Sequence, residues 1–198
     1  DWIAIPLDWT RWMPEAGQTA DFSSLDESMQ RAAECHSAVM ISLSNPPDWA
    51  LTAQGPSVEA TSQLISMLAA RYPGELQAVE LFPGANTVGG WKAAPDPAEY
   101  ARLYWEVKSS LQAQGISLIL VAAGLTPLDT SRTASDWQDL DFLRGLYSAG
   151  ASEWMDVIAL RFPQLSGSPL ASTADEMPLV LRRYEAIRDV IDDPSLSP

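Results

Sequence analysis

Five short segments of the chain are apolar at consecutive rather than alternate positions. Segments of this kind, rich in Val, Ile and Leu, are typical of strands that are buried on both faces of a parallel sheet. Successive segments begin roughly 40 residues apart, which leaves room for a helix and two loops between them. The predicted strands are Trp2–Leu7, Ala38–Leu43, Leu76–Phe82, Leu118–Ala123 and Val157–Phe162.

The intervening segments have the periodicity of amphipathic helices. The first is predicted from Ser24 to Glu34, because Ser24–Glu27 has the form of a capping box. The second is predicted over Val58–Tyr72 and the third begins at Asp96–Pro97, a cap followed by a first-turn proline. The fourth presents Leu140, Leu143 and Tyr147 on its apolar side, and the fifth presents Leu181, Tyr184, Ile187 and Ile191 before Pro194.

Strand and helix therefore alternate five times, which predicts an α/β fold with a parallel sheet. A doubly wound sheet usually carries a glycine-rich phosphate loop after an early strand. Here the loop after the first strand reads DWTRWMPEAG, and no G-x-G-x-x-G or P-loop motif occurs in the sequence. The pattern favours a (β/α)8-barrel-like fold, present as a partial barrel of about five βα units.

The charge of the chain narrows its possible partners. Twelve Lys and Arg stand against 26 Asp and Glu, which gives a net charge of −14. This balance argues against binding to nucleic acid or to an anionic membrane surface, and no apolar run has the length of a transmembrane segment. A single cysteine, Cys35, excludes an internal disulfide, and Cys35 with His36 is too small a set for a metal site. No cofactor is expected.

Several loop motifs agree in order and spacing with one enzyme family. They are DWTRWMPEAGQTADFSSLD, ISLSNPPDWA, VELFPGANTVGGWKAAPDPAEYARLY and LDFLRGLYSAGASEWMDVIALRFP. Together they resemble the clan A glycoside hydrolases, especially relatives of families 39 and 5. The resemblance implies one TIM-barrel domain over residues 1–198, containing strands two to six of the family barrel. It also implies that strands one, seven and eight are missing and that both sheet edges are open.

The resemblance also implies that the catalytic chemistry has been lost. The family sequence E-I-W-N-E-P-N aligns with ELFPGAN, which puts Gly84 on the general acid/base and Asn86 on the final Asn. Retaining hydrolysis needs two carboxyl groups about 5 Å apart. The family's inward Arg falls on Ala4, and its sixth-strand His and Tyr fall on Arg161 and Pro163. The nucleophile belongs to the seventh strand.

Three other carboxylates are weak catalytic candidates. Glu80 lies four residues before the acid position, on the same face of the predicted strand but deeper in the barrel. Asp8 and Asp48 follow strands and are expected at the mouth, where they form an acid pair or bind loop amides. Arg161 either neutralises Glu80 or binds an anionic group.

Eight tryptophans are many for 198 residues. Four of them follow strands and are candidates for stacking on sugar rings at the barrel mouth, or for packing over its top. The other four are expected in the core. The predicted sugar-binding residues are Trp9, Trp49, Asn86, Trp91 and Arg161, with Trp12 as the fourth loop tryptophan, and the predicted core tryptophans are Trp2, Trp105, Trp137 and Trp154.

Two functions remain open at this point. The favoured one is a catalytically degenerate glycosidase-like domain with a structural, protein-binding or carbohydrate-binding role. Its partner would be a polysaccharide, or a protein or other chain region that pairs with the open sheet edges. The alternative is an active retaining glycoside hydrolase whose acid or nucleophile comes from elsewhere. The resemblance implies an extracellular or cell-surface location in either case.

Overall fold

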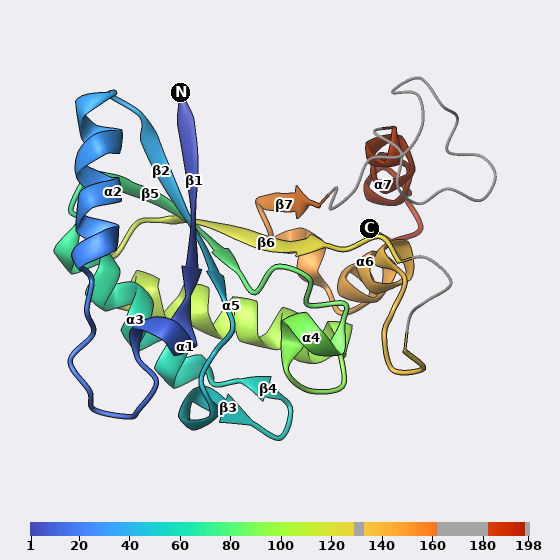
Figure 1. Ribbon diagram of the computed structural model, residues 1–198. Coiled ribbons are helices and arrows are strands. Elements are labelled where there is room, and N and C mark those ends of the chain that lie inside the picture. Colours follow the sequence, from blue (N-terminus) through green and yellow to red (C-terminus); the bar gives the residue numbers. More distant parts are fainter. Residues whose placement is uncertain (129–132, 162–181, 197–198) are drawn as a thin grey trace.

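A five-stranded parallel sheet is the framework of the molecule (Figure 1). The computed structural model describes residues 1–128, 133–161 and 182–196, except for the side chain of residue 123. Strands are hydrogen-bonded in the order β1-β2-β5-β6-β7, and every neighbouring pair is parallel. They are β1 (Trp2–Asp8), β2 (Ala38–Ser44), β5 (Leu76–Leu81), β6 (Ile119–Leu125) and β7 (Val157–Leu160).

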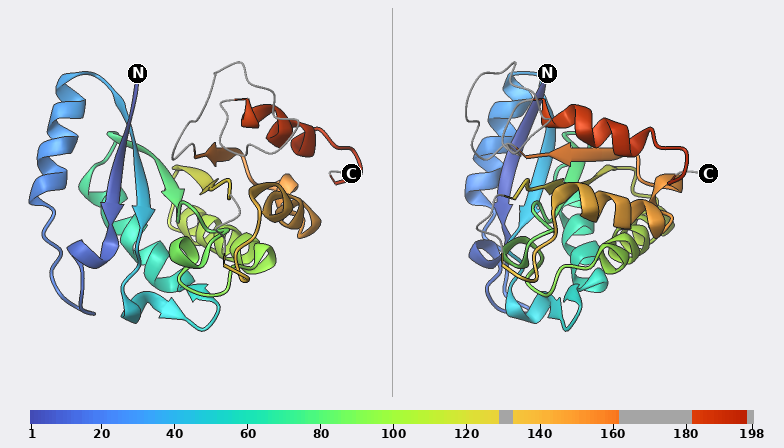
Figure 2. Two further views of the ribbon diagram at one scale, coloured as in Figure 1. Left: turned by 45° about the vertical axis from the view of Figure 1, so that its right-hand side comes forward. Right: turned by 90° about the vertical axis from the view of Figure 1, so that its right-hand side faces the viewer.

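Helices connect successive strands. α2 packs on β2 and α3 packs on β5, while α3 contacts α5, α5 contacts α6 and α6 contacts α7. Figure 2 shows α2 at the β1 end of this arrangement and α7 at the β7 end. The chain is thus a partial (β/α)8 barrel of five units, as the sequence predicts. The helices are α2 (Ser23–Glu34), α3 (Val58–Arg71), α5 (Pro97–Ala113), α6 (Asp139–Ser148) and α7 (Arg183–Ile191).

The two ends of the sheet differ in the size of their loops. Connections into β2, β5 and β6 are short and occupy residues 35–37, 72–75 and 114–118. Loops that leave the carboxyl ends are longer and contain structure of their own. These additions are α1 (Trp9–Trp12), the 3-10 helix η1 (Asp48–Ala50), the ribbon β3 (Leu51–Thr52) with β4 (Gly55–Pro56), and α4 (Val88–Trp91). In (β/α)8 barrels the carboxyl ends carry the functional residues.

Strand β5 ends one residue earlier than the sequence predicts. Phe82 has φ of 51°, in the left-handed region that bulky residues rarely adopt. The backbone N–H of Phe82 still donates to Leu43 O at 3.0 Å. Its ring is fully buried and meets Trp91 edge-on at 6.3 Å between ring centroids. The turn at Phe82 ends the alternation of the strand, so the predicted shared face of Glu80 and position 84 does not follow from strand geometry.

One helix start is confirmed and another is wrong. Asp96 caps α5, accepting a hydrogen bond from Ala98 N at 2.8 Å, with Pro97 in the first turn. Ser24 does not cap α2, which begins at Ser23 and has no side-chain cap bond. Instead Asp21 accepts from Ser23 N at 3.0 Å just before the helix. The capping-box pattern failed because the preceding Asp turn competes for the first free amide.

Helix α7 packs through fewer of its residues than its periodicity suggests. Ile187 and Val190 are buried, whereas Tyr184 is 49% exposed and Ile191 is 36% exposed. Leu181 and Phe162, which the sequence placed in this helix and in the fifth strand, lie outside the described residues, as does Pro163. The apolar contact is therefore small, and an ion pair supplements it.

That ion pair joins α7 to α6. Arg183 donates to both oxygens of Asp139, at 3.0 Å from Nε and 2.7 Å from the terminal nitrogen. The carboxylate is only 1% exposed and the arginine side chain 15%. Two-point geometry of this kind is the strong form of the Arg–carboxylate contact. The pair therefore fixes how α7 sits on α6.

A second polar cluster joins α2 to α3. Arg71 donates to both oxygens of Asp26 at 2.8 and 2.6 Å, and the Tyr72 hydroxyl donates to Asp26 at 2.7 Å. The guanidinium also lies 5.4 Å from the ring centroid of Phe22. Burial and the hydrogen bond to Asp26 raise the pKa of Tyr72 to about 12. The same bonds from Arg71 and Tyr72 lower the pKa of Asp26.

The raised pKa of Tyr72 predicts a loss of stability in alkali. Because the folded pKa exceeds the ordinary value of about 10, the contribution is complete below about pH 10 and is lost as the pH rises towards 12. We expect Tyr72→Phe to cost about 1 kcal/mol at pH 7 and to make the decline above pH 10 shallower. Urea unfolding between pH 7 and 11 measures both effects. Burial also raises the pKa values of Tyr104 and Tyr147, but both tyrosines are present in the wild type and in Tyr72→Phe. If the free energy of unfolding fell equally steeply with pH in the two proteins, the effect would not come from Tyr72.

No helix in the described ranges has both the length and the hydropathy that a membrane crossing requires.

Candidate functional site at the mouth of the partial barrel

The inner face of the sheet, which we define as the face carrying Met40, Ala78 and Glu80, changes from apolar to polar along the strands. Near the amino ends, Met40 is the register partner of Ala78. Two residues later, Ser42 is the partner of Glu80. Side chains two residues apart in a strand project from the same face. The polar layer therefore lies towards the mouth, where the long loops gather.

Glu80 is a buried carboxylate that is held from two neighbouring strands. It is 5% exposed. Its Oε2 accepts from Ser42 Oγ of β2 at 2.5 Å, and its Oε1 accepts from Gly124 N of β6 at 3.0 Å. A Cβ on Gly124 would come within 2.6 Å of that Oε1, so the close approach depends on glycine. These contacts hold the carboxylate in place and occupy both of its oxygens.

Arg161 lies next to this carboxylate without pairing with it. Its aliphatic stem crosses Gly124, with Cγ 2.8 Å and Cδ 3.2 Å from the place of a Gly124 Cβ. The two side chains form no ion pair within 4.0 Å, and Arg161 is exposed. Of its two predicted roles, neutralising Glu80 has no support in the geometry. Binding of an anionic group by Arg161 stays a prediction.

Gly84 occupies the position that the resemblance assigns to the general acid. Its φ is 77°, where residues with side chains are strained. A Cβ there would meet the hydroxyls of Thr126 at 3.2 Å and Thr87 at 3.7 Å. The backbone is fixed by Gly84 N, which donates to Gly124 O at 2.8 Å. Both the side chain and the backbone conformation at this site are thus unsuited to a carboxyl group.

Asn86 joins the loop after β5 to the connection between β6 and α6 instead of pointing into open space. It is fully buried. Its Nδ2 donates to Thr126 O at 2.8 Å and to Trp137 O at 2.9 Å, while its Oδ1 accepts from Thr126 N at 2.9 Å. These bonds use both N–H donors of the amide and one of the two acceptor sites of its oxygen. These bonds give Asn86 a structural role, which explains a buried asparagine at this position without invoking a bound sugar.

The two aspartates at the mouth have different surroundings. Asp8 caps the short helix α1, accepting from Arg11 N at 3.2 Å, and also accepts from Asn45 Nδ2 at 2.9 Å. Asp48 opens η1 and is exposed. It lines a cleft of about 320 Å³ from which Asp8 is absent. Asp8 therefore has hydrogen-bond partners within the loops, and an acid pair of Asp8 with Asp48 stays a prediction.

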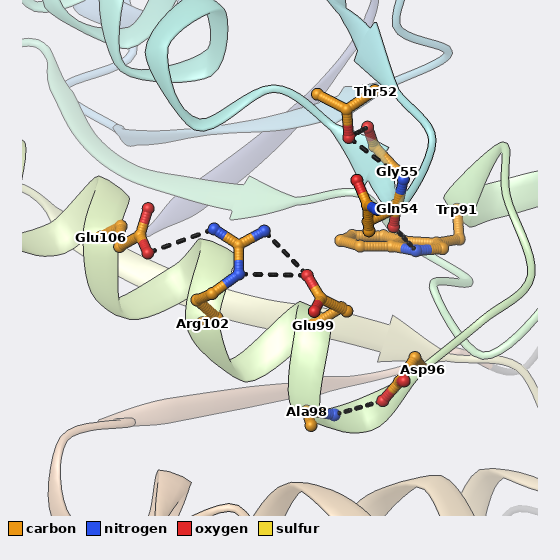
Figure 3. A network of polar contacts seen from close by, with 9 residues as sticks. All are labelled: Thr52, Gln54, Gly55, Trp91, Asp96, Ala98, Glu99, Arg102 and Glu106. Carbon is orange, nitrogen blue, oxygen red and sulfur yellow. Dashed lines mark hydrogen bonds and ion pairs between the residues drawn. The ribbon is translucent and has the colours of Figure 1, made fainter.

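The loop tryptophans are packing residues to differing degrees. Trp9 is fully buried and Trp91 is 1% exposed. The Trp91 indole donates to Gln54 O at 2.8 Å (Figure 3). Beside this bond, the Thr52 hydroxyl donates to Gly55 O. The indole also lies against α5, near the Asp96 cap of that helix. Trp49 is half-buried, meets Trp9 edge-on and donates to Met13 O at 3.0 Å. Trp12, also half-buried, packs on Phe22.

Three of the four tryptophans expected in the core are exposed, and Trp154 packs against the core. Trp2 is 57% exposed, Trp105 47% and Trp137 40%, while Trp154 is half-buried against Trp105. For the three exposed tryptophans the prediction was wrong because it equated being within an element with burial. Loops at the mouth fold back over the barrel top and cover their own aromatics. Trp137 is the exposed tryptophan at the mouth, where the Asn86 bond to its carbonyl holds it.

The cleft beside Asp48 contains residues that the sequence analysis did not identify. Three loops form it, through Thr10, Asn45, the Pro46–Pro47 pair, Asp48 and Lys92. Asn45 and Lys92 both have positive φ, 51° and 65°. Asp48 and Lys92 are exposed and form no ion pair with one another. The only signal in the sequence was the loop motif NPPD, because Asn tolerates a positive φ and the two prolines restrict the backbone of the loop.

Among the described residues, this cleft offers polar and charged groups for binding. Carboxylate, ammonium and amide groups around proline rings suit a polyol, which donates and accepts hydrogen bonds and has apolar C–H faces. No group of three or more His, Cys, Asp or Glu in the described ranges has the arrangement of a metal site.

The comparisons with known proteins support the fold. No protein-family profile matches the chain, and no curated sequence matches it. Two matching structures are of endo-glycoceramidase II from Rhodococcus sp., one with a five-membered iminocyclitol and one with a cellobiose-like imidazole. Their identities are 15% and 16%, with a TM-score of 0.53 for each. Each alignment covers 96% of this chain and 63% of that chain, so this chain spans less than two thirds of their length. The likeness supports the partial (β/α)8-barrel fold and no more.

Proposed function

We propose that this chain is a catalytically degenerate glycosidase-like domain, related to families 39 and 5, that binds carbohydrate or protein without hydrolysing glycosides. The observation that carries the proposal is Gly84. Its left-handed backbone and its neighbours Thr126 and Thr87 leave no carboxyl group at the expected acid position. A hydroxyl is a poor proton donor compared with a carboxylic acid, so the leaving oxygen would depart unassisted.

The nearest inner-face carboxylate does not replace the lost acid. Glu80 accepts hydrogen bonds from Ser42 and Gly124 on its two oxygens. Both oxygens are therefore engaged with groups of the protein rather than with a leaving group. Glu80 is thus suited to bracing three neighbouring strands at the base of the mouth.

The carbohydrate-binding part of the proposal rests on the cleft between Asn45, Asp48 and Lys92. Both charged groups are exposed and available to sugar hydroxyls. A polysaccharide would extend from there across the mouth towards Trp137, whose ring is partly exposed. Such a ligand, and the family resemblance, fit an extracellular or cell-surface location.

Substitution in the cleft provides a direct test of sugar binding. We expect Lys92→Ala to weaken retention of the chain by its polysaccharide about tenfold, because a charged group typically contributes about 1.5–3 kcal/mol to a hydrogen bond. Affinity electrophoresis in gels containing cellulose derivatives, xylan or mannan measures this effect. Arg31→Ala is the matched control, since Arg31 is also an exposed cation but lies on α2 in a weak ion pair. Equal retention of both variants would contradict the assignment of the cleft.

The alternative function predicts turnover. An active retaining hydrolase with an acid or nucleophile supplied from elsewhere would cleave 2,4-dinitrophenyl glycosides, whose leaving groups need little acid assistance. The proposed function predicts no cleavage above the uncatalysed rate. It also predicts that Gly84→Glu gains no activity, because the new side chain would be strained at φ of 77°.

A further inference from the structure

An apolar groove lies on the inner face of the sheet, below the polar layer. Its volume is about 380 Å³, and its lining includes Trp2, Ala4, Met40, Ile119, Val121 and Val157, all of them uncharged. Trp2 is 57% exposed, Ile119 42% and Val157 39%. Monomeric proteins seldom leave contiguous apolar surface uncovered unless something binds to it. The chain has a net charge of −14, so a groove without charged residues differs from the acidic character of the chain as a whole.

The free edge of β1 borders this groove, and its hydrogen-bonding groups can be assigned. Asp1 O accepts from Ala38 N at 2.9 Å, so the backbone of Asp1 faces β2. Successive residues of a strand point their backbone groups to opposite sides. Trp2, Ala4 and Pro6 therefore direct their backbone groups away from β2. No strand in the described ranges pairs with that side.

Pro6 divides this edge into two parts. Proline lacks an N–H, so position 6 offers only a carbonyl to an incoming strand. Complete donor and acceptor pairs remain at Trp2 and Ala4, which line the groove together with Ile3. Hydrogen-bonding capacity and apolar surface thus coincide in the amino-terminal half of β1, while the proline protects the half nearer the mouth.

We propose that a β-strand of a partner polypeptide pairs with the Trp2–Ala4 edge of β1 and places alternate apolar side chains in the groove. The inference rests on the proposed function, to whose protein-binding role it gives a surface. Strand addition supplies affinity through main-chain hydrogen bonds and specificity through pockets for alternate side chains. This edge meets both requirements. Binding there would not bury a charged side chain of the groove, because none of the lining residues is ionised.

Two observations favour a partner strand over a second copy of the chain. A second copy would carry the same net charge of −14, so the two copies would repel each other. It would also present the same groove, and two grooves that face each other do not fill each other.

A pair of synthetic peptides tests the proposal. The probe is a fluorescein-labelled heptapeptide with lysine and valine alternating, and the control has the same composition with its valines in one block. Charge and hydrophobicity are equal in the two, so only the alternating peptide matches an edge strand. Fluorescence anisotropy measures binding to the chain and to three variants, each checked for unchanged circular dichroism.

We expect the alternating peptide to bind at least tenfold more tightly than the blocked peptide. Trp2→Ser and Ala4→Pro should each weaken that binding tenfold or more, the first by removing groove surface and the second by removing an edge N–H. Trp105→Ser, which alters a tryptophan of similar exposure on α5, should change it less than twofold.

Several results would overturn the proposal. They are equal binding of the two peptides, no binding of either, or Trp2→Ser behaving like Trp105→Ser. A concentration-dependent dimer that excludes the peptide would also overturn it, because the occupant would then be a second copy. Turnover of an aryl glycoside bears on the proposed function alone and leaves the peptide result standing.

Discussion

Replacing Asp139 by asparagine is expected to lower the free energy of unfolding by about 3–5 kcal/mol, the usual cost of removing one partner of a buried ion pair. The carboxylate is 1% exposed and accepts two hydrogen bonds from Arg183. Asparagine keeps its shape but leaves the guanidinium of Arg183 without a counter-charge. Because the apolar contact of α7 is small, this ion pair is a large part of what holds α7 on α6.

The matched control is Asp141→Asn, two residues along the same helix. Asp141 pairs with Arg144 at 2.9 Å, but the two side chains are 60% and 50% exposed. A pair of this kind contributes about 0.2–1 kcal/mol. Urea unfolding of both variants, extrapolated to water, gives the comparison. Similar losses from both substitutions would mean that α7 does not depend on the buried pair.

Replacing Trp91 by alanine is expected to cost about 3–5 kcal/mol, as for other buried aromatic residues. Trp91 lies between Phe82 and Tyr100, with ring centroids 6.3 and 5.6 Å away, and covers Gly55. A Cβ on Gly55 would approach the indole to 2.4 Å, which shows how closely the β3–β4 ribbon packs on it. Truncation would leave a cavity under that ribbon and break the indole bond to Gln54 O.

Trp105→Ala is the control for this prediction. Trp105 is 47% exposed on α5 and contacts Trp154 at 5.8 Å between ring centroids. Its loss should cost about 1 kcal/mol or less. If Trp91→Ala were as mild as Trp105→Ala, Trp91 would not be the packing residue that the fold indicates, and its predicted role in sugar stacking would regain interest.

The strands were predictable because burial on both faces requires consecutive apolar residues, which can be recognised in a short stretch of sequence. All residues of a central parallel strand face helices or the barrel interior, so consecutive apolar residues mark it directly. Four of the five predicted starts coincide with observed ones, at Trp2, Ala38, Leu76 and Val157. The end of β5 was missed because nothing in the apolar pattern indicates that Phe82 adopts a left-handed backbone.

The geometry of the site depends on contacts that the sequence does not place side by side. Glu80 receives its hydrogen bonds from residues 38 and 44 positions away. Asn86 bonds to residues 40 and 51 positions away. The sequence identified both residues as noteworthy, but a local pattern cannot show whether the partner of a polar side chain is a ligand or another loop. The exposure of each tryptophan likewise depends on how the loops fold over it.

We propose that the two carboxyl groups with which retaining glycosidases act have no working counterpart in this chain. Retaining hydrolases form a covalent glycosyl-enzyme intermediate on a carboxylate, and fluorinated sugars with good leaving groups trap it. The most direct measurement is the intact mass of the protein after incubation with 2-deoxy-2-fluoro-glycosyl fluorides of glucose, mannose and xylose. We expect an unchanged mass with every reagent. A one-to-one glycosyl adduct on any carboxylate of the protein would contradict the claim.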